Sequence, residues 1–120
     1  MRRPVVIVED DEFIRENLKD FLESEGFQTF LAVNGKEGLD LIRKLRGNCL
    51  VLLDLQMPVI TGEQLLDALK AEVTELRSVP VVVLSARREP PHVPVSGFLR
   101  KPIDLDALLK LVEHNTTNDQ

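Results

Sequence analysis

The sequence predicts an α/β fold in which helices cover both faces of a parallel β-sheet. Three short segments, at 5–8, 50–53 and 81–84, are apolar at every position. Such runs are typical of strands that are buried on both faces in the middle of a parallel sheet. Two weaker candidates, at 27–33 and 97–99, are expected at the edges of the sheet. Helical patterns separate most of these strands, and this alternation predicts a doubly wound sheet.

Four amphipathic patterns predict helices, because their apolar residues recur at the spacing of one helical face. The four stripes are Ile14, Leu18, Phe21 and Leu22; Gly38, Leu41, Ile42 and Leu45; Leu65, Leu66, Leu69 and Val73; and Leu105, Leu108, Leu109 and Val112.

Capping residues support these helices. Asn34 with Glu37, and Thr61-Gly62-Glu63-Gln64, have the form of capping boxes, and Asp11 is expected to cap the first helix. Gly26 and Gly47 follow the first two helices, where a left-handed residue commonly ends a helix.

With the three apolar strands in the centre, the simplest strand order is 2-1-3-4-5, the flavodoxin-like arrangement. We expect one domain over 1–113, followed by a polar tail at 114–120 that frays.

Composition excludes several classes of protein. Twenty Asp and Glu against fifteen Lys and Arg give a net charge of −5, which disfavours binding to nucleic acid or to an anionic membrane surface. The apolar runs are too short to cross a bilayer. The single cysteine, Cys49, lies in an apolar run and is expected to be buried, which suits a reducing compartment such as the cytoplasm.

Polar residues follow the predicted strands at one edge of the sheet, where open α/β sheets bind their ligands. Glu9, Asp10 and Asp11 follow the first strand, Asp54 the third and Ser85 the fourth. Lys101 follows the fifth strand. Taken singly, each has an ordinary explanation, since Asp54 alone could be a turn residue and the acidic run a solvated helix start. Their convergence on one edge favours a functional site.

Charge at this edge predicts a metal ion. Glu9, Asp10 and Asp54 bring three negative charges. Lys101 returns one positive charge, so a divalent cation would make the site neutral. Carboxylate oxygens suit Mg²⁺ rather than Zn²⁺, and Mg²⁺ held this way usually serves a phosphoryl group. Asp54 could then be a nucleophile that forms an aspartyl phosphate, with Lys101 and Ser85 contacting the phosphoryl oxygens.

Four motifs, in order along the chain, resemble those of response-regulator receiver domains. They are Val6-Ile7-Val8-Glu9-Asp10-Asp11, Leu53-Asp54-Leu55-Gln56-Met57-Pro58 with Gly62, Pro80-Val81-Val82-Val83-Leu84-Ser85-Ala86, and Leu99-Arg100-Lys101-Pro102. The resemblance implies that the domain over 1–113 is a receiver in which Asp54 accepts the phosphoryl group. It implies that Asp10 binds Mg²⁺ directly and Glu9 through water, and that the Gln56 carbonyl is another ligand. It also implies that Ser85 and Phe98 form the switch, that Ala86 leaves access open, and that Lys101 is the charge partner.

One segment departs from that pattern. The stretch 87–96 is short and contains Pro90, Pro91 and Pro94, so a regular helix is not expected between the fourth and fifth strands. We expect an irregular connection, or at most one helical turn.

Three functions follow as alternatives. The first is a phosphorelay receiver that takes a phosphoryl group from a histidine kinase or a phosphotransfer protein and signals to a downstream protein or to an output domain outside this sequence. The second is a pseudo-receiver that binds partners without phosphorylation, which the missing helix would suit. The third, an aspartyl-phosphate hydrolase, is disfavoured because Gln56 stands where such enzymes carry a second acid. Turnover of an external substrate is therefore not expected.

Overall fold

A computed structural model describes residues 2–55, 62–72, 74–86, 91 and 94–117. Five parallel strands form one sheet in the order β2-β1-β3-β4-β5, as the sequence predicts. The strands are β1 (Val5–Val8), β2 (Thr29–Ala32), β3 (Leu50–Asp54), β4 (Val81–Ser85) and β5 (Gly97–Arg100). The three apolar strands occupy the centre and are buried along their whole length.

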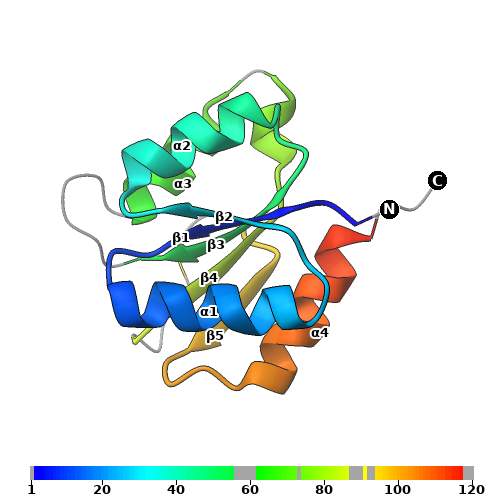
Figure 1. Cartoon of the computed structure of the whole chain (residues 1–120). Coiled ribbons are helices and arrows are strands. Elements are labelled where there is room, and N and C mark those ends of the chain that lie inside the picture. Colours follow the sequence, from blue (N-terminus) through cyan, green and yellow to red (C-terminus); the bar gives the residue numbers. More distant parts are fainter. Residues whose placement is uncertain (1, 56–61, 73, 87–90, 92–93, 118–120) are drawn as a thin grey trace.

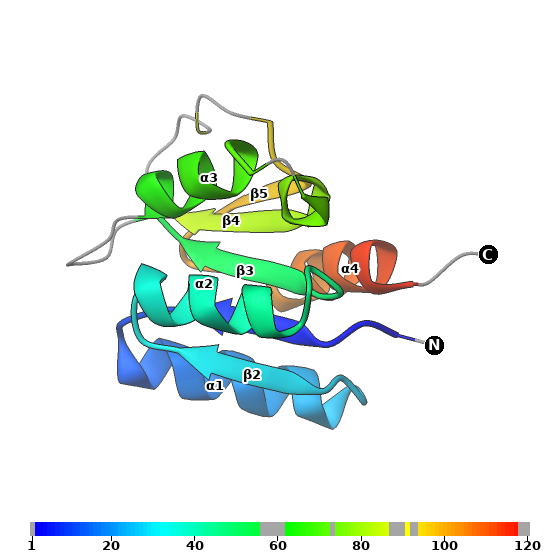
Figure 2. The ribbon, with the colours of Figure 1, turned by 90° about the horizontal axis from the view of Figure 1, so that it is seen from above.

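Helices cover both faces of the sheet (Figure 1). One face is covered by α1 (Glu12–Ser24) and α4 (Leu105–Thr116), and the other by α2 (Gly35–Lys44) and α3 (Gly62–Lys70). Seen from above, α2 and α3 lie over the central strands (Figure 2). A short 3-10 helix, η1 (Glu75–Ser78), which the sequence pattern did not predict, leads into β4.

Alternation along the central strands builds the two halves of the core. Val5 and Ile7 of β1 face the α1 and α4 side, whereas Val6 and Val8 face the α2 and α3 side. Cys49 is buried in this second half of the core, as expected, and burial raises its pKa to about 12. None of the helices in the described part of the chain has the length and apolarity needed to cross a membrane.

The predicted caps are confirmed where the structure describes them. The Asn34 side chain accepts a hydrogen bond from the Glu37 N–H at 2.9 Å, and the Glu37 carboxylate accepts one from the Val33 N–H at 3.1 Å. Gly26 and Gly47 have φ angles of 92° and 74°, the left-handed conformation that ends a helix. The proposed cap Thr61 and the stripe residue Val73 lie outside the described residues.

The expectation that the chain frays from His114 onward is wrong for residues 114–117. Residues near the start of the chain hold the end of α4 in place. The helix continues to Thr116, whose side chain is buried and donates to the Val112 carbonyl at 2.7 Å. The Arg3 N–H donates to the Thr116 carbonyl at 2.9 Å, and Arg2 forms an isolated antiparallel bridge with Thr117. These contacts join residues from opposite ends of the sequence, so no local sequence pattern predicts them.

The connection between β4 and β5 is described only at 86, 91 and 94–96, and none of these residues is helical. The Ser96 N–H donates to the Val81 carbonyl at 2.8 Å and brings the chain into β5. The predicted proline-rich, irregular course otherwise lies outside the described residues. The observed edge strands differ slightly from the predicted ones, since β2 is confined to Thr29–Ala32 and β5 extends by one residue to Arg100.

Candidate functional site

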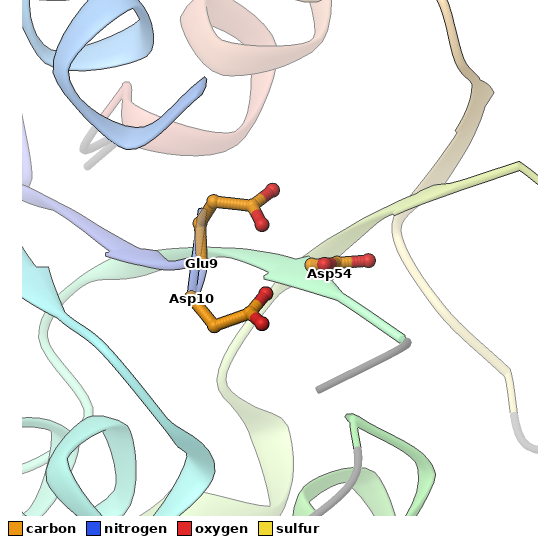
Figure 3. Close-up of side chains that lie close together, drawn as sticks. All are labelled: Glu9, Asp10 and Asp54. Carbon is orange, nitrogen blue, oxygen red and sulfur yellow. The ribbon is translucent and has the colours of Figure 1, made fainter. Parts of the chain in front are cut away.

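Three carboxylates meet where β1 and β3 end. Glu9 and Asp10 follow β1 directly, and Asp54 is the last residue of β3. The two strands are hydrogen-bonded neighbours with Val8 opposite Leu53, so their ends lie level. Carboxylate oxygens of Glu9, Asp10 and Asp54 lie within 4.8 Å of one another (Figure 3). The convergence expected from the sequence is therefore present.

Burial divides the three acids. Glu9 is 1% exposed and Asp54 is 4% exposed, whereas Asp10 is exposed to solvent. The cluster thus has two buried acids and one at the surface. A buried charge needs a partner, because burial without one is costly.

Lys101 supplies a positive charge to the two buried acids. Its Nζ lies 3.4 Å from Glu9 Oε1 and 3.5 Å from Asp54 Oδ1. The Lys101 backbone N–H donates to the Ser85 carbonyl at 2.8 Å, which ties the end of β5 to that of β4. The peptide bond from Lys101 to Pro102 is cis. One ammonium group therefore bridges the acids of two different strands.

Ser85 lies on β4, the strand next to that of Asp54, and Phe98 lies on β5, one strand further out. Asp54 pairs with Leu84 in the sheet, so Ser85, the last residue of β4, lies one position beyond the level of Asp54. The Ser85 side chain is buried. Phe98 pairs with Val83 and packs, half-buried, against the core on the α2 and α3 side. Ala86 is exposed, and Gln56 lies outside the described residues.

Gly62 begins α3 against the strand that carries Asp54. Its N–H donates to the Leu55 carbonyl at 3.0 Å. A Cβ at this position would lie 2.5 Å from the Asp54 carbonyl oxygen and 2.5 Å from Leu55 Cα. Only glycine permits so close an approach of α3 to the end of β3. The start of α3 therefore fixes the backbone at Asp54.

The Glu9 carboxylate binds a proton more readily than an ordinary glutamate does. Burial, followed by the hydrogen bond and the charge of Asp54, raises the pKa of Glu9 from 4.5 to about 7. The Asp11 N–H, which donates to Glu9 Oε2 at 3.2 Å, and Lys101 oppose the increase. Near neutral pH, the Glu9 carboxyl group is therefore protonated for part of the time.

This shift predicts a dependence of stability on pH. Because the folded-state pKa of Glu9 lies above its unfolded value, the protonated form favours folding; this contribution is complete below pH 4.5 and disappears as the pH rises to about 7. The unfolding free energy of the metal-free protein should fall over this window by at most about 3 kcal/mol. Urea unfolding in a chelator at several pH values, compared with Glu9→Gln, measures it. Equal pH profiles for the two proteins would contradict the assignment.

The cluster could hold a metal ion. Its donors are all carboxylate oxygens, and oxygen donors of this kind fit a hard divalent cation. The buried Cys49 belongs to the core and takes no part in the cluster. A cation would also relieve the repulsion among three neighbouring carboxylates, which one lysine only partly offsets.

One contact at this site was not predicted from the sequence. Arg15 Nη1 donates to the Glu9 carbonyl at 3.0 Å and to the Asp10 carbonyl at 3.3 Å. The signal that could have revealed it is a cation in the first turn of a helix, an unfavourable place for positive charge.

Comparison with known proteins identifies the family. The family model described as response regulator receiver domain matches residues 5–113. The chain belongs to this family. The domain is therefore the receiver of a two-component response regulator, a signalling module, as the four motifs suggested.

Its relatives differ in length. The domain is 34% identical over 114 residues to the transcriptional regulatory protein CrdR of Helicobacter pylori, covering 90% of this chain and 52% of that protein. It is 31% identical over 119 residues to the polar-differentiation response regulator DivK of Brucella anthropi, covering 94% and 95%. The chain thus spans about half of CrdR and almost all of DivK.

Solved structures share the fold of this chain. The chemotaxis protein CheY4 of Vibrio cholerae superposes with a TM-score of 0.83 at 25% identity, covering 96% of this chain and 99% of that one. The receiver domain of a histidine kinase from Syntrophus aciditrophicus also gives 0.83, at 29% identity, covering 93% and 88%. The flavodoxin-like fold predicted from the sequence is thereby confirmed.

Proposed function

We propose that Asp54 accepts a phosphoryl group in a Mg²⁺-dependent transfer from a phosphohistidine. The observation that carries the proposal is the position of the buried Asp54 carboxylate, which has Glu9, Asp10 and Lys101 around it. The phosphohistidine would belong to a sensor histidine kinase or a histidine phosphotransfer protein.

The acidic cluster would hold the metal. Asp10 and Asp54 would bind Mg²⁺ directly, Glu9 would bind it through water, and the backbone carbonyl of Gln56 would add a further oxygen. When bound, Mg²⁺ supplies positive charge that neutralises the phosphoryl oxygens during transfer. The all-oxygen donor set supports this choice of ion.

The transfer itself needs little from the protein beyond placement and charge. An Asp54 carboxylate oxygen attacks phosphorus, the phosphorus–nitrogen bond of the donor breaks, and its electron pair returns to the imidazole. An acyl phosphate on Asp54 results. The Lys101 ammonium, already 3.5 Å from Asp54, neutralises one phosphoryl oxygen, and the Ser85 hydroxyl donates to another. Movement of Ser85, followed by Phe98 on the adjacent strand, would carry the signal to the surface.

Intact-mass spectrometry tests the proposal. The domain is incubated with Mg²⁺ and a small phosphodonor, so that no kinase has to be known. One phosphoryl-sized gain in mass is expected, and it should be lost in Asp54→Asn and in a chelator. If the wild type gains no mass, the proposal fails and the phosphorylation-independent interaction module takes its place; a gain that persists in Asp54→Asn rejects Asp54 as the acceptor.

The setting of this activity is proposed on the same basis. A relative of nearly equal length, DivK, and a longer one, CrdR, are both named as regulators, so the receiver would signal either to a separate downstream protein or to an output domain. We place this signalling in the cytoplasm, with no turnover of an external substrate.

A further inference from the structure

Arg15 reaches back from α1 to the loop that carries two of the three acids. It lies in the first turn of the helix, after the N-cap Asp11, whose side chain accepts from the Ile14 N–H at 3.0 Å. Arg15 Nη1 donates to the Glu9 carbonyl at 3.0 Å and to the Asp10 carbonyl at 3.3 Å. Helical side chains lean toward the N-terminus of their helix, which is how the guanidinium reaches residues five and six positions earlier.

A cation in this place is locally unfavourable. The first turn of a helix presents unsatisfied N–H groups and the positive end of the helix dipole, so acidic residues are preferred there. Glu12 follows that preference, and Arg15 does not. A local rule that is broken beside a functional site often indicates that the residue serves the site. The two hydrogen bonds show what Arg15 contributes in return.

Those bonds act on the least restrained acid of the cluster. Glu9 is 1% exposed and is held by packing and by Lys101. Asp10 is exposed, so packing does little to keep its carboxylate near the two acids that repel it. The carbonyls of Glu9 and Asp10 lie on either side of the Asp10 Cα. Fixing both of them therefore fixes the backbone direction from which the Asp10 side chain projects.

We propose that Arg15 is a positioning residue for the metal site, acting through the backbone of Glu9 and Asp10. The inference rests on the proposed function, because it concerns the same Mg²⁺ site. Arg15 would not touch the metal or the phosphoryl group. It would hold the loop in the conformation that aims the Asp10 carboxylate at Asp54.

The sign of one measurement separates this role from a simple charge effect. Removing a positive charge close to a cation site should, by charge alone, make Mg²⁺ bind more tightly. Losing the restraint on Asp10 should make Mg²⁺ bind more weakly, by about tenfold, as is common when the groups that orient metal ligands are removed. Arg15→Met keeps the apolar stem of the side chain but removes the charge and the donors.

The experiment is a calorimetric titration of the domain with Mg²⁺ alone. Arg15→Met should bind about tenfold more weakly than wild type, and Arg15→Lys, which keeps a charged donor, should recover part of the loss. Lys19→Met is the matched control, because Lys19 lies one turn further along α1 and pairs with Asp20 and Glu23 instead of the loop. This control should bind Mg²⁺ at least as tightly as wild type.

The possible results are distinct. Unchanged or tighter binding by Arg15→Met overturns the role of Arg15 while leaving the metal site intact. Equal weakening in Arg15→Met and Lys19→Met would also overturn it. No Mg²⁺ binding by the wild type would instead reject the proposed function. Amide NMR shifts of Glu9, Asp10 and Asp11 in metal-free Arg15→Met provide a second readout: large changes confined to this loop are expected, and an unaltered loop contradicts the inference.

Discussion

Asp10→Asn should reduce Mg²⁺-dependent phosphorylation by about 100-fold or more, because it removes a charged ligand from the proposed metal site. The fold should survive, since Asp10 is exposed and contributes no side chain to the core. The metal-free variant should in fact be slightly more stable than wild type. Its neutral amide no longer repels Glu9 and Asp54, whose oxygens lie within 4.8 Å of the Asp10 carboxylate.

Asp11→Asn is the matched control for this variant. The substitution removes the same charge from the adjacent position, and asparagine caps a helix as well as aspartate does. The Asp11 side chain caps α1 and is absent from the acidic cluster. Mass spectrometry with a small phosphodonor, together with thermal unfolding in a chelator, measures both effects. Equal losses in the two variants would show that general charge, rather than a ligand at Asp10, supports the transfer.

The convergence of the acids could be predicted from the sequence because it depends on topology. In a parallel sheet, residues that follow neighbouring strands meet at one edge. Continuous apolar runs mark the central strands, so the amino-acid sequence alone places Glu9 and Asp54 at adjacent strand ends. The register of Val8 opposite Leu53 confirms this placement. The same argument places Lys101, which comes directly after β5, at this edge of the sheet.

The unequal environments of the acids could not be predicted. Glu9 and Asp10 are neighbours in sequence and similar in chemistry, yet one is buried with a raised pKa and the other is exposed. Which of them points inward depends on the direction in which the chain leaves β1. That direction depends in turn on contacts such as those of Arg15 with the loop carbonyls.

Long-range contacts explain the error at the C-terminus in the same way. Polar residues from His114 onward resemble a fraying tail when only neighbours are considered. The end of α4 is instead held by Arg2 and Arg3, which lie at the opposite end of the sequence. A pattern within one helix carries no information about such a partner.

Lys101→Ala should separate phosphorylation from the conformational response. The Lys101 ammonium contacts Glu9 at 3.4 Å and Asp54 at 3.5 Å, so a phosphoryl group on Asp54 would offer it new oxygens and draw it away from the acids. The Lys101 backbone N–H is hydrogen-bonded to the Ser85 carbonyl, and β5, which precedes Lys101, includes Phe98. The lysine therefore connects the phosphoryl site to both proposed switch residues.

The expected result has two parts. Transfer from a small phosphodonor should slow on the order of 100-fold, the usual cost of losing one charge-stabilising donor. Mg²⁺ affinity should not fall, because Lys101→Ala removes a positive charge and leaves Glu9, Asp10 and Asp54 in place. In this respect Lys101→Ala should differ sharply from Asp10→Asn.

Amide NMR spectra with and without a beryllofluoride phosphoryl mimic measure the response. In Lys101→Ala, shifts at Asp54 should persist at saturating mimic, while those at Ser85 and Phe98 should shrink toward zero. Lys110→Ala, which removes an exposed lysine on α4, is the control and should respond like wild type. Full shifts at Phe98 in Lys101→Ala would mean that the signal reaches β5 by another route, and a loss of Mg²⁺ affinity as large as in Asp10→Asn would place Lys101 in metal binding instead of in the switch.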